Sequence, residues 1–373
     1  MSRVSLTFLW ETPARAVPVF SVFIPFFGCP RRCVFCSQHD QTGQQASPLD
    51  EILARAANDL RARRAQGRPP VELAFYGGTF TALAPRDLDA CLDMADSLLR
   101  DGCITRFRCS TRPDRLDAAL LARLRRHGCR TVELGIQSFS DTALQASERH
   151  YSGRQAAEAC RLVRDAGLAL GVQLLPGMPG HQPEDFLADV RCALSLGADM
   201  LRFYPCLVLA GTELARRWQQ GLYTPWPLPQ TLSLLARGWL YARRAGVPVI
   251  RMGLAPEPGM EAALLAGPAD RNLGGRVLGR ALWLHVCACL LRARGDDAAP
   301  SEIRAAALLD ALLANEEAPG ASPRARALYL PRACQGFFRG PGDELGKAWA
   351  ALGITRRNLV WTAGQTACLH LEA

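Results

Sequence analysis

The sequence predicts an α/β fold, a partial (β/α)6 barrel followed by a mainly helical C-terminal extension. Short runs rich in β-branched and aromatic residues alternate with segments whose apolar residues recur every three or four positions. Several of the short runs are apolar on both faces, as in the strands of a buried parallel sheet. Proline begins several of the helical segments and glycine follows their ends.

Six runs are predicted as strands, at 19–25, 71–76, 105–110, 131–136, 168–175 and 200–207. The predicted helices between them span 49–64, 85–100, 113–127, 153–165 and 183–195. Pro85, Pro113 and Pro183 stand in first turns, and Gly102, Gly128, Gly167 and Gly197 follow helix ends. Short connections favour right-handed crossovers and a parallel sheet, with the chemistry at the C-terminal ends of the strands. A seventh run at 247–252 is a candidate to close the sheet.

The pattern changes after about residue 253, where prolines and glycines cluster. We therefore expect a core barrel over 1–252 and an extension over 253–373, whose role the sequence does not indicate. Helical segments are predicted at 273–294 and 301–315, and a loop at 316–324. Residues 327–373 have no assignable pattern.

The chain has 373 residues and a formal net charge of +9. Lys347 is the only lysine among its 44 basic residues, and arginine forks suit phosphates and carboxylates. A GC-rich coding bias also produces an arginine excess, and the arginines are spread along the predicted helices. Charge alone therefore adds little weight to a nucleic-acid partner.

The N-terminus does not resemble a signal peptide, and no run reaches the ~18 apolar residues that a membrane span needs. We expect a cytoplasmic protein without membrane contact, in which disulfides rarely persist. The 14 cysteines are then expected to be packed hydrophobes, metal ligands or reactive thiols.

The strongest motif is Cys29-Pro-Arg-Arg-Cys33-Val-Phe-Cys36, directly after the first predicted strand. Three thiolates this close can hold three corners of an iron–sulfur cube, leaving one iron open to a small chelating molecule. Soft thiolates also select zinc. With His39 the three cysteines offer a Cys₃His zinc site, which would make the chain a zinc-stabilised binding protein without turnover.

The cysteine loop resembles that of the radical S-adenosylmethionine (SAM) superfamily, with Phe35 in its aromatic place. Tyr76-Gly77-Gly78-Thr79 is similar to the glycine-rich element of that family, where the backbone approaches a ligand closely. More specifically, the chain resembles the Elp3-like branch over about 19–227. The matching stretches are GGTFTAL (77–83), STRPD (110–114), ELGIQSF (133–139), SERHYSG (147–153), LLPGMPG (174–180) and RFYPCLVLAGTELARRWQQGLY (202–223).

The resemblance implies a TIM-barrel-like radical SAM core with a [4Fe–4S] cluster on Cys29, Cys33 and Cys36. It implies that eight further residues bind SAM: Gly77, Gly78 and Thr79 at the amino end, Gln137 and Gln173 at the ribose, Arg149 at the carboxylate, and Ser110 and Arg112 facing the same site. Alternatives stay open. If they do not bind SAM, Arg149 is a surface helix residue and Gln173 is a buried amide. Arg202 and Tyr204 either line the substrate cavity or pack at the barrel end.

The implied chemistry is reductive cleavage of SAM to methionine and a 5′-deoxyadenosyl radical that abstracts hydrogen. An external one-electron donor of flavodoxin or ferredoxin type would supply the electron. The Elp3 likeness favours tRNA as the substrate and tRNA modification as the process, and a small metabolite or peptide is the alternative. No residue is indicated as catalytic beyond the cofactor ligands.

Two features depart from Elp3. The gap between the first two cysteines is shorter, and no glycine-rich acetyl-CoA loop is recognisable, so we expect a short bacterial form without the acetyltransferase domain. The isolated cysteines are expected in the core. Cys287 and Cys289 diverge on a predicted helix, so that pair alone is not expected to chelate a metal. The alternative is a second metal site in which Cys334 and Cys368 join them.

Overall fold

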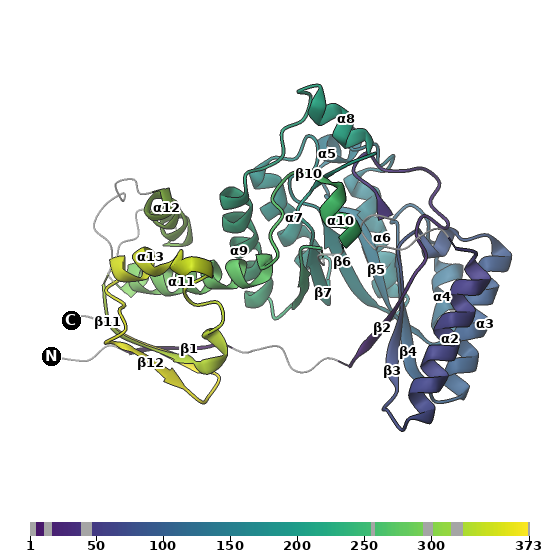
Figure 1. Ribbon diagram of the computed structural model, residues 1–373, viewed down its shortest axis with the longest axis horizontal. Helices are drawn as coiled ribbons and strands as arrows, with labels where there is room; N and C mark the ends of the chain where they lie inside the picture. The colour runs from purple at the N-terminus through teal and green to yellow at the C-terminus, as the bar shows by residue number, and fades with distance from the viewer. Residues whose placement is uncertain are drawn as a thin grey trace. The chain divides into compact units, whose positions relative to one another are not determined.

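The computed structural model describes residues 5–10, 17–38, 47–254, 258–293, 301–314 and 324–371. It contains two compact units (Figure 1). The barrel unit comprises Arg15–Thr231 and Tyr241–Arg271, and the terminal unit comprises Met1–Ala14, Leu232–Leu240 and Asn272–Ala373. The first residues of the chain and the middle of helix α9 (Leu228–Arg244) therefore group with the C-terminal residues.

The barrel unit is built on a seven-stranded parallel sheet in the order β2-β3-β4-β5-β6-β7-β9. These strands are β2 (Val19–Phe23), β3 (Val71–Tyr76), β4 (Ile104–Thr111), β5 (Cys129–Gln137), β6 (Ala169–Leu174), β7 (Met200–Phe203) and β9 (Val249–Met252). Every predicted strand is present, and the predicted partial barrel is confirmed. The seventh strand extends the sheet beyond β7 and does not close it onto β2.

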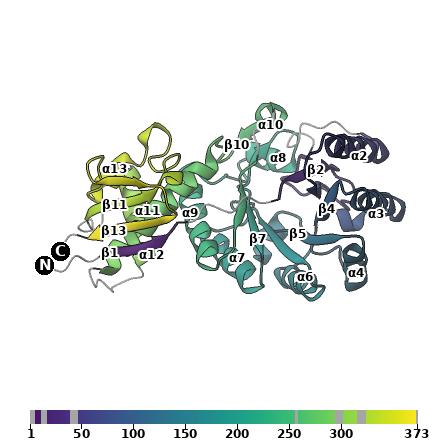
Figure 2. The same cartoon turned by 90° about the horizontal axis from the view of Figure 1, so that it is seen from below.

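Helices cover the outer face of the curved sheet, as Figure 2 shows for α2, α3, α4 and α6. The crossover helices are α2 (Leu49–Ala65), α3 (Pro85–Arg100), α4 (Ala118–Arg126), α6 (Gly153–Asp165) and α7 (Pro183–Ser195). Apolar residues of each helix are buried, for example Leu92 in α3 and Val163 in α6. Shorter elements complete the unit: η1 (Phe80–Ala82), α5 (Asp141–Ala146), β8 (Val208–Leu209), α8 (Glu213–Gln219), α10 (Pro258–Ala263) and β10 (Leu264–Ala266).

The predicted start of the helix at 113 is wrong. Helix α4 begins at Ala118, because the Asp117 side chain accepts a hydrogen bond from the backbone N–H of Leu120 and caps the helix there. Pro113 lies before that cap. It stands between Arg112 and Asp114, whose side chains form an ion pair of 2.9 Å across it.

The terminal unit combines helices with a four-stranded sheet in the order β1-β13-β11-β12. Helices α11 (Leu273–Ala293) and α12 (Ser301–Ala314) agree with the predicted segments to within one residue. Residues without a predicted pattern form β11 (Ala325–Pro331), η2 (Arg332–Cys334), η3 (Pro341–Asp343), α13 (Gly346–Ala351), β12 (Leu359–Thr362) and β13 (Thr366–Leu371). The edge strand β1 (Ser5–Leu9) comes from the other end of the chain and pairs antiparallel with β13.

Helix α11 bears on the expectation of a protein without membrane contact. By length and composition alone, Leu273–Ala293 is long and apolar enough to span a membrane. Arg276 and Arg280 interrupt its apolar residues, so a search for an unbroken apolar run misses it. Within the described residues, 67% of its apolar window is buried, and the core helix of a globular protein has the same composition.

Candidate functional site

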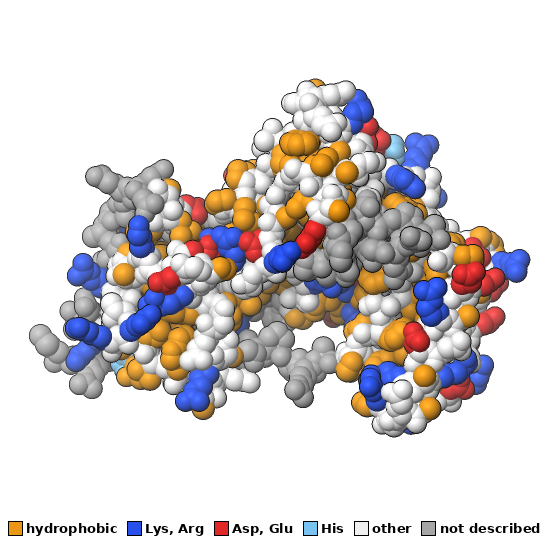
Figure 3. All heavy atoms as spheres, in the orientation of Figure 1, with side chains coloured by type: hydrophobic (Ala, Val, Ile, Leu, Met, Phe, Trp, Pro, Cys, Tyr) orange, Lys and Arg blue, Asp and Glu red, His pale blue; other side chains and the backbone are white. Residues whose placement is uncertain are grey.

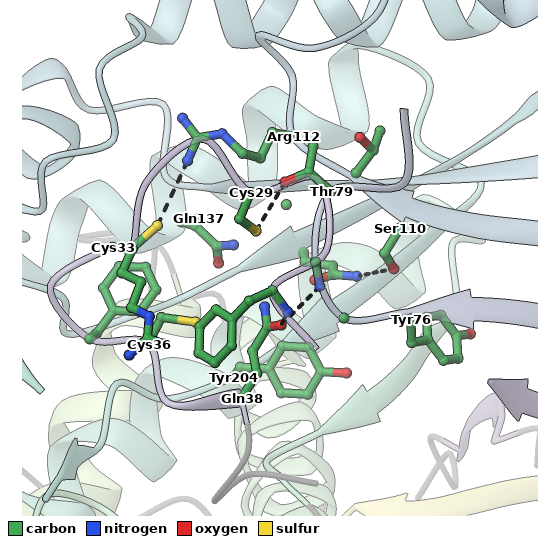
Figure 4. Close-up of a pocket in the computed structure, with 18 of the residues that line it drawn as sticks. Cys29, Cys33, Cys36, Gln38, Tyr76, Thr79, Ser110, Arg112, Gln137 and Tyr204 are labelled. Carbon is green, nitrogen blue, oxygen red and sulfur yellow. Dashed lines mark hydrogen bonds between the residues drawn. The ribbon is translucent and has the colours of Figure 1, made fainter. Parts of the chain in front are cut away.

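A cavity of about 490 Å³ lies at the C-terminal ends of the strands in the barrel unit. All eleven residues that the resemblance implies for the cluster and for SAM line this cavity. Their binding roles remain predictions, but the fold brings them together from five strands and the loops that follow. Figure 4 shows the arrangement.

The three cysteine thiols come from the loop that follows β2 and face the cavity. The Cys29 thiol lies 3.2 Å from the hydroxyl of Thr79, and Arg112 Nη1 points at Cys33 Sγ from 3.7 Å (Figure 4). Burial raises the pKa of the Cys29 thiol and raises that of Cys36 to about 12, and repulsion from the neighbouring thiolates adds to both shifts. Thiolates here would therefore be costly without a cationic partner.

This donor chemistry fits an iron–sulfur cluster. In a cubane each thiolate binds a different iron, so the three sulfurs need not meet at one point. A single zinc ion does need its ligands around one point. Among the described residues, no three His, Cys, Asp or Glu side chains are grouped to hold one ion. His39, the fourth ligand of the zinc hypothesis, lies outside the described residues.

The glycine turn after β3 packs tightly against the cysteine loop. Gly78 has a φ of +57°, and a Cβ there would lie 2.2 Å from the carbonyl oxygen of Phe27. Its N–H donates to Oε1 of Gln38 over 2.9 Å, and the same oxygen accepts from the N–H of Phe26 over 2.6 Å. Close packing of two loops thus requires glycine at 78 whether or not a ligand approaches it.

Arg149 is a buried residue of the cavity wall and not the surface helix residue of the alternative reading. It lies between α5 and α6, and its guanidinium donates to three groups. Nη1 donates to Cys33 Sγ over 2.8 Å, Nη2 to the Gly135 carbonyl over 2.6 Å, and Nε to the Tyr151 hydroxyl over 2.9 Å. Arg112 donates in turn to the Arg149 carbonyl over 2.6 Å.

The floor of the cavity is organised by Glu133, a fully buried carboxylate of β5. It forms ion pairs with Arg202 over 2.6 Å and Arg108 over 3.2 Å, and it accepts a hydrogen bond from the Tyr76 hydroxyl over 2.9 Å. Gln173 donates to Ser110 over 3.1 Å and reaches the same carboxylate at 3.4 Å. Gln173 is therefore a hydrogen-bonded amide and a cavity residue at once.

Two further features concern the cavity wall. Gln137 adopts a φ of +68°, which is strained for a residue with a side chain and is a conformation that concentrates at functional sites. Arg202 and Tyr204 line the cavity, joined by a 2.9 Å hydrogen bond. The described wall contains six arginines and no carboxylate, which suits anionic ligands.

Sequence reasoning missed Gln38, Glu133 and Tyr151. The sequence did contain a signal for Glu133, because an acidic residue inside an otherwise apolar strand must find a partner if it is buried. It contained no signal for Gln38, since the contacts of that residue join two loops far apart in the chain. Tyr151 stands in the matched stretch SERHYSG, and its hydroxyl donates to the Gly135 and Ile136 carbonyls.

Among the described residues, the other cysteines form no group of three or more metal ligands. Cys91, Cys103, Cys109, Cys129 and Cys160 are buried in the barrel unit, as expected, whereas Cys192 is half-buried. In the terminal unit, Cys287 and Cys334 are buried, Cys289 lies 3.8 Å from His285, and Cys368 lies 3.6 Å from His370. Across the described ranges these side chains form no group of three or more ligands, contrary to the candidate second metal site.

Two family models match the chain in succession. The model of the radical SAM superfamily matches residues 23–193, and that of the Radical_SAM C-terminal domain matches residues 198–280. The two stretches cover strands β3 to β9 of the parallel sheet and every residue of the cavity except Ser21.

The chain is 31% identical over 269 residues to the tRNA uridine(34) acetyltransferase of Dehalococcoides mccartyi (strain CBDB1), covering 63% of this chain and 57% of that protein. It is 25% identical over 204 residues to the heme chaperone HemW of Escherichia coli (strain K12), covering 54% of each. It thus spans about half the length of the curated relatives it matches.

Among solved structures, the archaeal Elp3 of Methanocaldococcus infernus, lacking residues 1–46, matches with a TM-score of 0.53 and 20% identity. The match covers 74% of this chain and 63% of that one, and at this identity it establishes a shared fold. Since both family models match in order along one parallel half-barrel, the chain belongs to the radical SAM superfamily of enzymes and is similar to its Elp3-like members.

Proposed function

We propose that this protein binds a [4Fe–4S] cluster through Cys29, Cys33 and Cys36 and binds SAM beside it in the same cavity. The single observation that supports this is that the three thiols and the eight residues implied for SAM line one cavity. When bound, the cluster supplies one electron to SAM, whose cleavage yields the 5′-deoxyadenosyl radical.

The chain's own residues have separate tasks in this proposal. Arg149 and Arg112 present guanidinium groups to Cys33 and to the carboxylate of SAM. Ser110 and Gln173 are joined by a hydrogen bond and offer polar atoms to the ribose together with Gln137. Glu133 holds Arg202 and Tyr76 on the cavity floor.

We propose tRNA as the substrate, with tRNA modification as the process in the cytoplasm. The support is the likeness to a relative named as a tRNA uridine(34) acetyltransferase. Surface charge contributes less, because on the face seen in Figure 3 Lys and Arg side chains are scattered among Asp and Glu. A small metabolite or peptide is the alternative substrate. The heme chaperones among the relatives suggest a third candidate function, in which the protein holds a cluster and carries heme.

The test is anaerobic reconstitution of the purified protein, followed by addition of dithionite and SAM. We expect four iron atoms per chain and formation of 5′-deoxyadenosine. Cys33→Ser should abolish both while far-UV circular dichroism stays unchanged, because the thiolates serve the cofactor and not the core. Cys160→Ser is the matched control, since Cys160 is buried away from the cavity. Stoichiometric zinc without iron would overturn the proposal.

The substrate is tested separately. Bound tRNA that is released by salt would support RNA, because phosphate contacts weaken steeply as salt rises. If tRNA is not retained at low salt, the tRNA assignment is wrong, and heme titration and small-molecule screening then decide between the other outcomes.

A further inference from the structure

A second and smaller pocket opens beside the cysteine loop and shares Arg31 and Arg112 with the large cavity described above. It measures about 220 Å³ and is lined by Pro30, Arg31, Arg112, Asp114, Arg115 and His150. We propose that this pocket and its exposed rim are the docking surface for an acidic protein that carries single electrons. The inference rests on the proposed function, because such a carrier has a role only if the neighbouring thiols hold a cluster.

The rim of the pocket is positively charged. Arg31, Arg115 and His150 are exposed, and Arg32 is exposed next to them. Arg32 stacks on the Phe26 ring at 4.4 Å, and among the described residues no carboxylate forms an ion pair with Arg31 or Arg32. Such unpaired guanidinium groups attract an acidic partner and orient its approach.

The single acidic residue of the pocket does not cancel this charge. The Asp114 side chain is 16% exposed, and it is shared between Arg112 at 2.9 Å and Arg115 at 3.5 Å. Two arginines against one carboxylate leave one positive charge in excess, before Arg31 and Arg32 are counted. The surface therefore keeps a net positive charge even around Asp114.

The pocket is also close to the thiols. Pro30 and Arg31 directly follow Cys29 in the chain, and Arg112 lines both the pocket and the large cavity. Arg112 Nη1 lies 3.7 Å from Cys33 Sγ. A protein seated on the pocket is thus separated from a proposed cluster ligand by one side chain. Electron transfer slows steeply with distance, so a donor gains most by docking where the intervening protein is thinnest.

The charge of the surface suits a transient carrier. Electron-transfer encounters use small interfaces and depend on charge for their association rate. In the electron-transfer step, a flavin hydroquinone anion would give up one electron and become the neutral semiquinone, and the proposed cluster would gain that electron. RNA backbone at the same arginines is the competing occupant, and the experiment distinguishes the two.

The experiment uses the reconstituted full-length protein and an acidic flavodoxin. Arg115→Glu and His150→Glu are separate test variants, because neither residue lines the large cavity. Arg126→Glu is the control, since Arg126 is exposed near the opposite end of α4 and makes the same charge change as Arg115→Glu. Calorimetry with oxidised flavodoxin measures binding without turnover, and 5′-deoxyadenosine formation is measured with flavodoxin and, separately, with dithionite.

We expect each test variant to weaken flavodoxin binding about tenfold at low salt, because rim charges control encounter, while Arg126→Glu binds as the wild type does. With dithionite, all four proteins should form 5′-deoxyadenosine at the same rate, which also shows that they are folded. Unchanged flavodoxin affinity in both test variants would overturn the inference.

Two other outcomes are decisive. If the test variants lose tRNA retention but bind flavodoxin normally, the surface is an RNA contact and the carrier inference is wrong. If the wild type forms no 5′-deoxyadenosine even with dithionite, the proposed function itself fails and the inference falls with it. The dithionite arm therefore separates the two failures.

Discussion

The guanidinium of Arg149 donates a 2.8 Å hydrogen bond to Sγ of Cys33, a residue 116 positions earlier in the chain. This contact joins the loop of the proposed cluster ligands to the residue proposed for the SAM carboxylate. Burial alone would lower the pKa of Arg149, but its contacts with the Tyr151 hydroxyl and the Cys33 sulfur outweigh burial and raise that pKa, so the guanidinium stays charged. The site therefore contains a fixed positive charge beside the three cysteines.

Replacing Arg149 tests its proposed role. We expect Arg149→Lys to weaken SAM binding by roughly 10–100-fold, because a hydrogen bond to a charged group contributes about 1.5–3 kcal/mol and lysine cannot reproduce the fork. Iron content should change much less. Equilibrium dialysis with SAM and iron analysis measure the two quantities. Arg154→Lys, at an exposed ion pair with Glu158, is the control. Unchanged SAM affinity in Arg149→Lys would show that the role is assigned wrongly.

Gly78→Ala should lower the free energy of unfolding by more than about 2 kcal/mol. The left-handed backbone costs roughly 1–2 kcal/mol for alanine, and the new Cβ would overlap the Phe27 carbonyl. Gly67→Ala is the matched control, with a φ of +73° and no heavy atom within 4 Å of the new Cβ. Gly67→Ala should lose only the free energy of unfolding that the left-handed backbone costs. Urea denaturation measures both variants, and equal losses would contradict the packing argument.

Glu133→Gln should destabilise the barrel unit by about 3–5 kcal/mol, because it leaves the Arg202 guanidinium, whose side chain is only 11% exposed, without its carboxylate partner. Arg108 also loses Glu133 but keeps its ion pair with Glu72. Glu158→Gln removes an exposed ion pair with Arg154 and should cost less than about 0.5 kcal/mol. Urea titrations compare the two variants with the wild type. Similar midpoints for Glu133→Gln and the wild type would show that the buried network adds no net stability.

The terminal unit should have an acid-sensitive ion pair. Burial alone would raise the pKa of Glu344, but hydrogen bonds from Arg280 and Arg276 outweigh it and hold that pKa below its usual 4.5. A carboxylate with a lowered folded-state pKa stabilises the fold above its unfolded-state pKa, and this contribution is lost as pH falls through the folded-state value.

Glu344→Gln should therefore cost stability at pH 7, and the gap between variant and wild type should narrow as pH falls below 4.5. Thermal unfolding of both proteins at several pH values measures the gap. A constant gap from pH 7 to pH 3 would contradict the assignment.

Local pattern was enough to locate most of the barrel. The predicted bounds of β3, α3, α6 and α7 agree with the structure, because the apolar period, a first-turn proline or a capping residue is contained in each segment. The start of α4 was predicted wrongly, since Pro113 is compatible with a first turn while the cap at Asp117 decides the start. The spacing of Cys29, Cys33 and Cys36 likewise pointed to a metal centre without knowledge of the fold.

The tertiary structure decided what depends on contacts between distant residues. β1 pairs with β13, so Thr7 faces Cys368 across 361 positions, and no local period can reveal such a partner. Gln38 bridges Phe26 and Gly78, and Glu133 collects Arg108, Arg202 and Tyr76 from three other strands. The sequence by itself determined the strands, most helices and the cysteine loop, because their signals are local. Which buried charges and loops meet depended on the folded chain, since burial pairs polar groups wherever the topology brings them together.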